Sequence, residues 1–194
     1  MITINRATNA FLGIDLQVDF MPSGALPVAF GDTIVRPAAQ TAEKFDTVIL
    51  TQDWHPLDHC SFKKQGGPWP IHCPAGEIGA QIHSDFPDRL VTLYFRKGTE
   101  LNVDSYSGFR DNAGKKTGLA GYLRERGIKR IFVCGLARDF CVKATAIDGA
   151  ALGFEVYVLD DLTRAVFPES KEQVDQEFQA AGVRIITSSM LSTA

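Results

Sequence analysis

Short apolar runs alternate along this chain with longer segments in which apolar residues recur at spacings of three and four. The short runs predict strands. The longer segments predict helices, because one face of a helix returns to the core about every 3.6 residues. Strands are expected at residues 10–14, 47–51, 90–95, 130–134, 155–159 and 183–187. Helices are expected at residues 31–45, 118–126, 139–152 and 169–181.

This alternation predicts an α/β fold, an open and mostly parallel six-stranded sheet with helices on both faces. The 194 residues are expected to form one domain, residues 1–194. Gly127, Gly153 and Gly182 follow three of the expected helices, where glycine favours the helix end. The stretch 105–116 is expected to be a loop, either a lid or a surface turn. Ligands of such sheets bind beyond the carboxyl ends of the strands.

Charge and composition narrow the classes of partner. The formal net charge is −3, and no run of Lys and Arg exceeds two residues, which argues against a nucleic-acid partner. Residues 1–10 lack the pattern of a signal peptide, and no stretch reaches the roughly 18 apolar residues of a membrane span. We therefore expect a cytoplasmic protein without a membrane partner. The four cysteines do not make a disulfide framework, so reduced thiols are expected.

Three of the four histidines, His55, His59 and His72, fall in one short stretch that also holds Asp53. Imidazole and carboxylate are ligands of a divalent ion such as zinc, so the clustering predicts a metal site. Pro56 favours an extended backbone at His55, which turns Asp53 and His55 to the same side.

Two other interpretations of the histidine stretch stay open at this point. The histidines could be solvated side chains of a polar surface loop. Cys60 and Cys73 stand beside histidines and could instead be sulfur ligands of a structural zinc ion, although no Cys-x-x-Cys pair supports this.

Reactive side chains follow four of the expected strands, namely Asp15, Asp53, Lys97 and Cys141. Because the carboxyl ends of parallel strands open on one edge of a sheet, these side chains are expected to share one crevice. Residues 133–142 have the pattern of a strand, a glycine-bearing turn and the start of a helix. A helix amino terminus and a nearby lysine both favour a thiolate, so a lowered pKa is expected for Cys141. Backbone amides at the same turn could bind an oxyanion.

Each of these residues also has a structural interpretation when taken singly. Asp15 could cap a turn, and either it or the nearby Asp19 is expected to bond loop amides. Lys97 could be solvated, as most lysines are. Cys141 could be a small buried apolar side chain, an interpretation that suits the mid-strand Cys134 better.

Together these residues resemble the nicotinamidase branch of the isochorismatase-like cysteine hydrolases over nearly the whole chain. The resemblance implies a Rossmann-like three-layer fold and hydrolysis of nicotinamide to nicotinate and ammonia through a cysteine thioester, in NAD salvage. It also implies pyrazinamide as a further substrate. The segments that carry it are Ile14–Phe20, Asp53–Pro56, His59–Phe62, Trp69–Cys73, Arg96–Gly98 and Gly135–Val142.

The resemblance implies a role for each matching residue. Cys141 is implied as the nucleophile, Asp15 as the general acid and base, and Lys97 as the cation between them. A non-proline cis peptide is implied between Leu136 and Ala137, with the Ala137 and Cys141 amides as oxyanion donors. The implied metal ligands are Asp53, His55 and His72, and the implied aromatic walls of the substrate pocket are Phe20, Trp69 and Tyr106.

The metal that the resemblance implies is one divalent ion, with zinc favoured and iron or manganese as alternatives. His59 matches a position that is a fourth ligand in some members only. Arg138 and Phe140 depart from the usual residues of the family, and both are expected to adjoin the pocket, which leaves the breadth of amide substrates open.

Two other functions stay open. The chain could be a different carboxamide or ureido hydrolase of the same superfamily, although many of those lack the metal loop. It could also be a non-catalytic metal-binding protein, in which Cys141 would be unreactive. The oligomeric state is open too, with a homodimer as the first expectation for a soluble enzyme.

Overall fold

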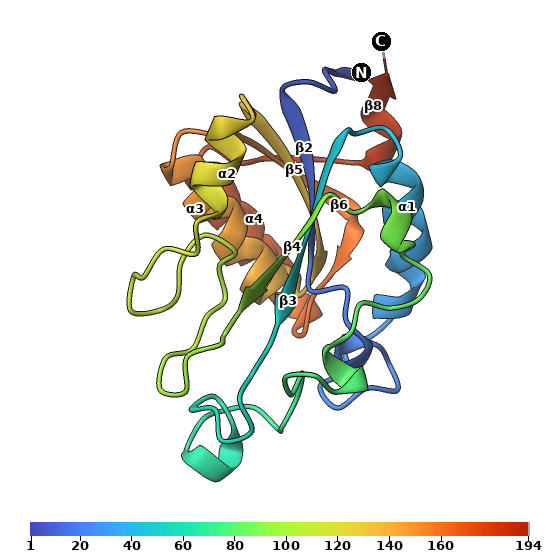
Figure 1. Cartoon of the computed structure of the whole chain (residues 1–194). Coiled ribbons are helices and arrows are strands. Elements are labelled where there is room, and N and C mark those ends of the chain that lie inside the picture. The colour runs from blue at the N-terminus through green and yellow to red at the C-terminus, as the bar shows by residue number, and fades with distance from the viewer. Residues whose placement is uncertain (194) are drawn as a thin grey trace.

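A six-stranded sheet forms the centre of the computed structural model, which describes residues 1–193 (Figure 1). Its strand order is β4-β3-β2-β5-β6-β7, and every neighbouring pair is parallel. The predicted fold class and the six predicted strands are confirmed. The strands are β2 (Asn9–Ile14), β3 (Thr47–Asp53), β4 (Leu93–Lys97), β5 (Arg130–Leu136), β6 (Glu155–Arg164) and β7 (Arg184–Ile186).

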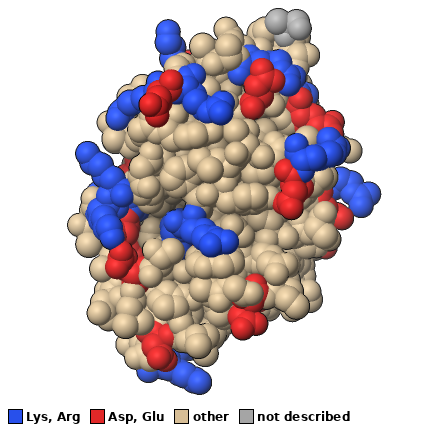
Figure 2. Space-filling model, viewed as in Figure 1, with Lys and Arg blue, Asp and Glu red and all other residues tan. Residues whose placement is uncertain are grey.

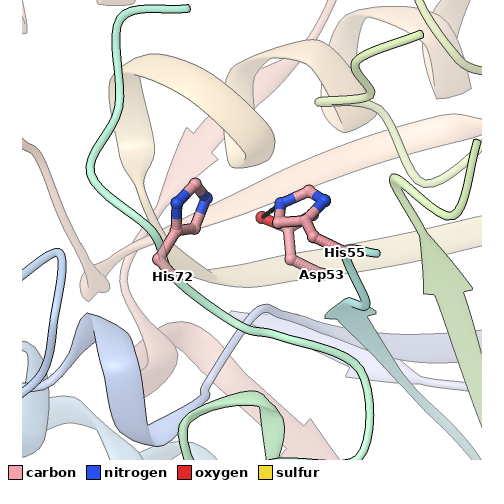
Figure 3. A group of neighbouring side chains, drawn as sticks. All are labelled: Asp53, His55 and His72. Atoms are coloured by element: carbon pink, nitrogen blue, oxygen red, sulfur yellow. Dashed lines mark ion pairs between the residues drawn. The ribbon is translucent and has the colours of Figure 1, made fainter. Parts of the chain in front are cut away.

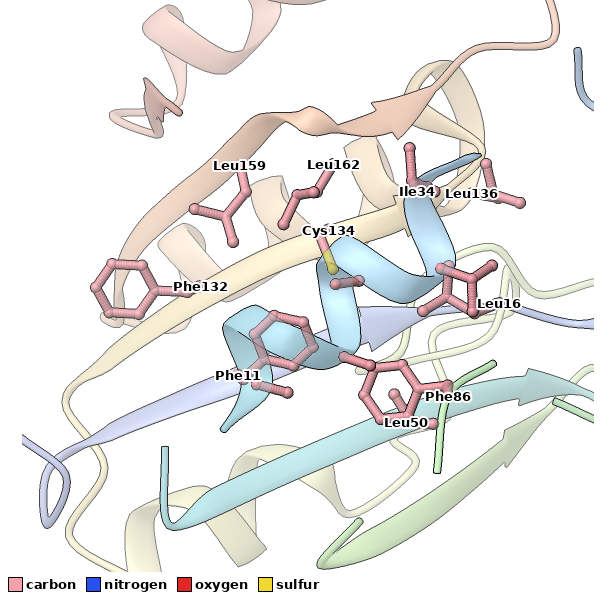
Figure 4. Close-up of a cluster of buried hydrophobic side chains, with 14 of the residues drawn as sticks. Phe11, Leu16, Ile34, Leu50, Phe86, Phe132, Cys134, Leu136, Leu159 and Leu162 are labelled. Atoms are coloured by element: carbon pink, nitrogen blue, oxygen red, sulfur yellow. The ribbon is translucent and has the colours of Figure 1, made fainter. Parts of the chain in front are cut away.

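Helices cover both faces of the sheet, with α1 on one face and the other three on the opposite face (Figure 1). Their bounds are α1 (Val35–Ala42), α2 (Leu119–Glu125), α3 (Lys143–Ala151) and α4 (Lys171–Ala180). Side chains alternate along each strand, so Phe132 of β5 packs toward α1 while Ile131 packs toward the other helices. Figure 4 shows part of the cluster on the α1 side, including Phe11, Leu50 and Phe132.

Several predicted elements begin elsewhere or divide in two. The strand expected from residue 90 begins at Leu93, because Asp88–Leu90 forms a 3₁₀ turn. The helix expected at 31–45 is a 3₁₀ turn followed by α1, since Pro37 has no N–H to bond in the first turn. The helix expected at 139–152 is a π-helical turn, Arg138–Val142, followed by α3. The 3₁₀ turn before α1 is Gly31–Ile34. The remaining 3₁₀ turns are Val18–Phe20, Lys63–Gln65, Ile78–Ala80, Pro168–Ser170 and Ser188–Met190.

Two short strands were not predicted. β1 (Ile2–Ile4) and β8 (Leu191–Thr193) pair in parallel as a separate two-stranded sheet near the two ends of the described chain (Figure 1). Three residues are too few to show an alternating pattern, although Ile4 and Leu191 are both buried.

Three expectations about loops and cysteines are confirmed. Gly127, Gly153 and Gly182 all have a positive φ just after a helix. The stretch 105–116 contains no helix or extended strand. All four cysteines are free thiols.

The surface and the helices add two observations. On the face of the molecule in Figure 2, Lys and Arg are interspersed with Asp and Glu, and no large patch has one sign. Among the described residues, none of the helices is long and apolar enough to cross a membrane.

The strand order reverses between β2 and β5, which lie side by side while their connections run to opposite sides of the sheet. A ligand crevice is expected at the carboxyl ends of such a strand pair. Gly135 makes the close approach of these strands possible. Its φ is 111°, and a Cβ added there would lie 2.1 Å from the carbonyl oxygen of Ile14.

We therefore expect Gly135→Ala to lower the free energy of unfolding by at least about 3 kcal/mol, because the new methyl group meets backbone in a conformation that alanine disfavours. Gly121→Ala is the matched control. Gly121 lies inside α2 with open space around it, so alanine should stabilise the protein by about 0.5–1 kcal/mol. Urea denaturation measures both, and equal stability of the two variants would contradict the expectation.

Candidate active site

Three buried groups meet beyond the ends of β2, β4 and β5. The Lys97 Nζ lies 2.9 Å from Asp15 Oδ2 and 3.3 Å from Cys141 Sγ. It also donates a hydrogen bond of 2.5 Å to Asp53 Oδ1. Asp15 is 0% exposed, Lys97 3% and Cys141 6%, so these charges interact with little screening by water. The sequence prediction that these strand ends share one crevice is confirmed.

Burial governs how protons are held in this cluster. It raises the pKa of the Cys141 thiol well above its usual value, and the Lys97 ammonium only partly opposes this. The expected lowering of the Cys141 pKa is therefore wrong, because burial and the two nearby carboxylates outweigh the cation. Burial likewise raises the pKa of Asp15. Burial would lower the pKa of Lys97, but Asp15 and Asp53 hold it well above its usual value.

The local backbone aims Asp15 at this cluster. Asp15 follows β2 with a φ of 47°, a conformation that a non-glycine residue adopts only when its surroundings enforce it. The Thr51 hydroxyl donates a 2.6 Å hydrogen bond to Asp15 Oδ1 and accepts one of 3.2 Å from the Asp15 N–H. Asp15 Oδ2 has no aligned hydrogen-bond donor among the described residues. Thr51 thus holds the carboxylate at Oδ1, while Oδ2 faces the Lys97 ammonium and is the oxygen able to accept a proton.

The turn Arg138–Val142 presents Cys141 beside Lys97. The Leu136–Ala137 peptide bond before this turn is cis, as the resemblance implied. The Ala137 carbonyl accepts hydrogen bonds from the N–H groups of Phe140 and Val142, at 3.0 and 3.1 Å. Burial also raises the pKa of Cys134 and of Cys73, but their neighbours differ from those of Cys141. Cys134 packs in the apolar cluster on the α1 side, and the Cys73 thiol contacts the Gly79 carbonyl at 3.8 Å, whereas Cys141 has Lys97 beside it.

Asp53, His55 and His72 form a second buried group next to the first (Figure 3). One ligand atom from each lies within 4.8 Å of the others, a spacing that suits one divalent ion. The His55 Nδ1 bonds the Gly98 carbonyl and the His72 Nδ1 bonds the Pro70 carbonyl, both at 2.8 Å. This leaves the Nε2 of each ring without a backbone partner, as in a histidine oriented for a metal.

The pKa of Asp53 fits a metal ligand. Burial alone would raise it, but Lys97 and His55 lower it well below the usual value. The Asp53 side chain is therefore ionised and can bind a cation. The sequence did not single out Gln17, whose side chain fixes the Asp53 backbone: it accepts a 2.8 Å hydrogen bond from the Asp53 N–H and donates one of 2.8 Å to the Asp53 carbonyl.

The structure separates His59 from this ligand group. Its Nδ1 bonds the Ser61 hydroxyl at 2.7 Å, and its Nε2 bonds the Val103 carbonyl at 3.2 Å. The His59 ring stacks on His55 with a 4.1 Å distance between ring centroids, so it packs behind that ring.

The alternatives for the histidine stretch lose support. His55, His59 and His72 are all buried, so they are not solvated surface side chains. Neither Cys60 nor Cys73 belongs to a group of potential metal ligands among residues 1–193.

A cavity with mostly apolar walls opens above Cys141. Larger hollows lie elsewhere on the surface, but among those described this is the one that Cys141, Asp53 and His72 all line. The aromatic residues that the resemblance implied all line it too. The sequence did not indicate Leu26, Val28 and Val166, which complete the walls. The residues that form the walls are Phe20, Leu26, Val28, Trp69, Tyr106, Ala137, Phe140 and Val166.

Phe140 lines this cavity, whereas Arg138 does not. Phe140 lines it as expected and meets Trp69 edge to face at 5.1 Å between ring centroids. The expectation that Arg138 adjoins the cavity is wrong: its side chain is directed to β6 and α4, where it pairs with Asp160 and Asp175.

Of the two aspartates after β2, Asp19 is the structural one, as expected for one of the pair. It accepts hydrogen bonds from the backbone N–H groups of Cys73 and Ala25.

The stretch 105–116 begins at the site and then leaves it. The Ser105 carbonyl accepts a 3.3 Å hydrogen bond from Lys97, and the Tyr106 hydroxyl accepts one of 3.2 Å from Trp69. Farther along, Arg110 forms an exposed ion pair of 2.8 Å with Asp148 of α3. The loop therefore supplies one wall of the cavity from its first residues.

Comparisons with known proteins agree with this geometry. The isochorismatase domain family matches residues 9–190. A nicotinamidase of Acinetobacter baylyi is 38% identical, and the alignment covers 96% of this chain and 96% of the relative.

Solved structures extend the likeness to three dimensions. The crystal structure of PnC1 from L. infantum, in complex with nicotinate, has a TM-score of 0.98 and 41% identity and covers 100% of this chain and 99% of that one. The pyrazinamidase of Pyrococcus horikoshii, in complex with zinc, has a TM-score of 0.84 and 40% identity, with coverage of 92% and 98%. The family match over residues 9–190 and the near-complete coverage of these relatives show that the chain belongs to the isochorismatase family.

Proposed function

We propose that the protein is a nicotinamidase, which hydrolyses nicotinamide to nicotinate and ammonia, with pyrazinamide as a second substrate. One observation carries the proposal: a buried Asp15–Lys97–Cys141 cluster and a buried Asp53–His55–His72 group line or adjoin the same aromatic cavity. The first suits attack on an amide and the second suits an anchor for a ring nitrogen. The full-length likeness to nicotinamidases supports the same substrate.

The reaction begins with Asp15 as the general base. Asp15 takes the proton of the Cys141 thiol, and the sulfur attacks the carboxamide carbon of the substrate. The raised pKa values of both groups suit this exchange, since the thiol stays protonated until a base within reach accepts its proton. The carbon–nitrogen bond then breaks, and Asp15 returns the proton to the departing ammonia. A thioester of Cys141 remains.

A water molecule completes the reaction. Asp15 accepts a proton from this water, the hydroxide attacks the thioester carbonyl, and the carbon–sulfur bond breaks to release nicotinate. The Cys141 sulfur recovers its proton. In both steps negative charge develops on the carbonyl oxygen, and we assign the backbone N–H groups of Ala137 and Cys141 as its donors. One such donor contributes roughly 2.7 to 4 kcal/mol to the stability of the transition state.

Asp53, His55 and His72 fit a divalent metal, because one carboxylate and two oriented imidazoles form a donor set suited to zinc, iron or manganese. We favour zinc, which the Pyrococcus horikoshii relative contains. When bound, the ion supplies a ligand position for the ring nitrogen of the substrate. Phe20, Trp69 and the other walls hold the flat ring and exclude water.

The proposed reaction suggests a metabolic role for the enzyme. Hydrolysis of nicotinamide would return nicotinate to NAD salvage, and we place the enzyme in the cytoplasm as a homodimer.

The direct test is ammonia release from a panel of amides. We expect the highest kcat/KM with nicotinamide, a measurable rate with pyrazinamide and no turnover of benzamide, which lacks a ring nitrogen. The panel also includes ureido compounds such as N-carbamoyl amino acids. A preference for a ureido compound would replace the proposal with a different hydrolase of the same superfamily.

We expect Cys141→Ser to lower kcat by at least about 10³-fold, because the alcohol is a far weaker nucleophile in the same place. Its metal content should equal that of the wild type, since Cys141 is outside the proposed ligand group. Cys134→Ser controls for the loss of a buried thiol remote from the cavity and should keep its kcat. Ammonia assays and elemental analysis measure both variants. Near-normal turnover by Cys141→Ser would rule out the covalent route.

We expect Gly98→Ala to weaken metal binding about 10- to 100-fold, because the new methyl group would lie 2.4 Å from His55 Cε1 and displace that ring. Gly76→Ala is the matched control. Gly76 also has a positive φ, 86° against 61° for Gly98, but a methyl group there meets nothing within 4 Å. Titration of the metal-free proteins with zinc measures the affinities. Equal affinities of the two variants would show that His55 is not a ligand.

Metal removal is expected to raise KM for nicotinamide far more than it changes the reactivity of Cys141, because the ion anchors the ring while Asp15 and Lys97 act on the thiol. Dialysis against a chelator, followed by assays with and without added zinc, measures KM. Alkylation of Cys141 by iodoacetamide, followed by peptide mass spectrometry, measures the thiol. Full activity after the metal is removed would contradict this division of roles.

A further inference from the structure

Arg138 is a buried arginine at the first position of the turn that carries Cys141. Its side chain is 4% exposed and extends away from the substrate cavity. The Nη1 lies 2.9 Å from Asp160 Oδ1 and donates a 3.1 Å hydrogen bond to the Thr163 hydroxyl. The Nη2 pairs with Asp175 of α4. The guanidinium therefore joins the turn to two other elements of the fold.

An irregularity of β6 supplies two of these partners. Val133 of β5 pairs with Val158, but Gly135 pairs with Thr163, so β6 contains three more residues than β5 over the same stretch. Asp160 lies within the extra stretch and Thr163 at its end. The bulge brings oxygen acceptors to the point where β5 ends and the Cys141 turn begins.

Helix α4 completes the surroundings of the guanidinium. Lys171 lies 3.2 Å from Asp160 Oδ1 and 2.9 Å from Asp175 Oδ2, so each carboxylate has two cationic neighbours. The Arg138 guanidinium also lies over the Phe178 ring, 5.3 Å from its centroid. A planar guanidinium can pair, donate and stack at once, which an ammonium cannot do. Arg138 is thus held from three sides.

The position of the turn is critical because Cys141 lies three residues farther on. Its Sγ must remain 3.3 Å from Lys97 and within reach of Asp15 for the proton to move. The next residue along the turn, Asp139, is anchored as well: its carboxylate accepts hydrogen bonds of 3.0 and 2.9 Å from the N–H groups of Val166 and Phe167.

We propose that Arg138 is a positioning residue for the nucleophile, whose ion pairs with Asp160 and Asp175 fix the turn and hold Cys141 against Lys97 and Asp15. The inference rests on the proposed function in one respect, that Cys141 is the attacking group. The metal ligands and most walls of the substrate cavity lie outside the turn, so loss of the guanidinium impairs the chemical step far more than it impairs binding.

The test compares Arg138→Met, which keeps the apolar stem, with Arg138→Lys, which keeps the charge. Lys143→Met is the matched control. Lys143 begins α3 directly after the turn and forms a 2.9 Å ion pair with Glu177 of α4, so its loss removes a similar link outside the turn. For each protein, kcat and KM for nicotinamide, the rate of Cys141 alkylation by iodoacetamide, zinc content and the melting temperature are measured.

We expect Arg138→Met to lower kcat and the alkylation rate by at least about tenfold each, with KM and zinc content within about twofold of the wild type. Arg138→Lys should recover part of both rates. Lys143→Met should keep both rates, whatever its melting temperature. If Arg138→Met keeps the kcat and alkylation rate of Lys143→Met, Arg138 is only a structural residue and the inference is overturned.

Two further measurements keep the result decisive. If Arg138→Met does not fold, Asp175→Asn replaces it, because the Asp175 side chain is 27% exposed and Asp160 still pairs with Arg138. An unchanged kcat and alkylation rate in a folded Asp175→Asn would then overturn the inference. If the wild type releases no ammonia from nicotinamide, the proposed function fails, while the alkylation rates still decide whether Arg138 positions the thiol.

Discussion

The Lys97 ammonium is the interaction on which the site depends. It is buried among two carboxylates and a thiol, and it touches all three. A buried ammonium is stable only with such partners, and two buried carboxylates this close would repel each other without it. Lys97 also joins the two halves of the site, because Asp53 belongs to the proposed metal ligands and Asp15 to the proposed catalytic groups. Each half therefore needs the other for its charge state.

The parallel sheet makes this convergence possible. Asp53 and Lys97 are register partners on the adjacent strands β3 and β4, and β2 and β5 bring Asp15 and the Cys141 turn to the same edge. Gly135 lets β2 and β5 approach closely at the point where the strand order reverses. The fold therefore assembles the site from residues that lie far apart in the chain, and the loop between β3 and β4 adds the histidines.

The residues that could be predicted from the sequence are those whose chemistry is visible in their type and position. Asp15, Lys97 and Cys141 follow strands, and the clustered histidines stand out by their rarity. Thr51 and Gln17 could not be found in this way, since a threonine in a strand and a glutamine after one are common. Their roles depend on which backbone and side-chain atoms the tertiary fold places beside them. The bulge in β6 and the direction of the Arg138 side chain, away from the cavity, likewise depend on the tertiary fold.

The raised pKa of Cys141 shows the limit of local reasoning most clearly. A turn before a helix and a nearby lysine predict a thiolate, but the depth of burial and the two carboxylates reverse the sign. These contributions come from four elements of the sheet edge and are invisible in any one of them. The consequence is mechanistic, because a protonated thiol needs Asp15 as a base within reach.

The thioester at Cys141 is the central claim of this account, and its formation can be followed during the first turnover. Excess enzyme is mixed with nicotinamide and quenched in acid at successive times, and ammonia, nicotinate and the Cys141 peptide are quantified. The account predicts that ammonia appears before nicotinate, while a nicotinoyl group appears on Cys141 and then disappears. Release of ammonia and nicotinate in step, with Cys141 unmodified at every time, would contradict it.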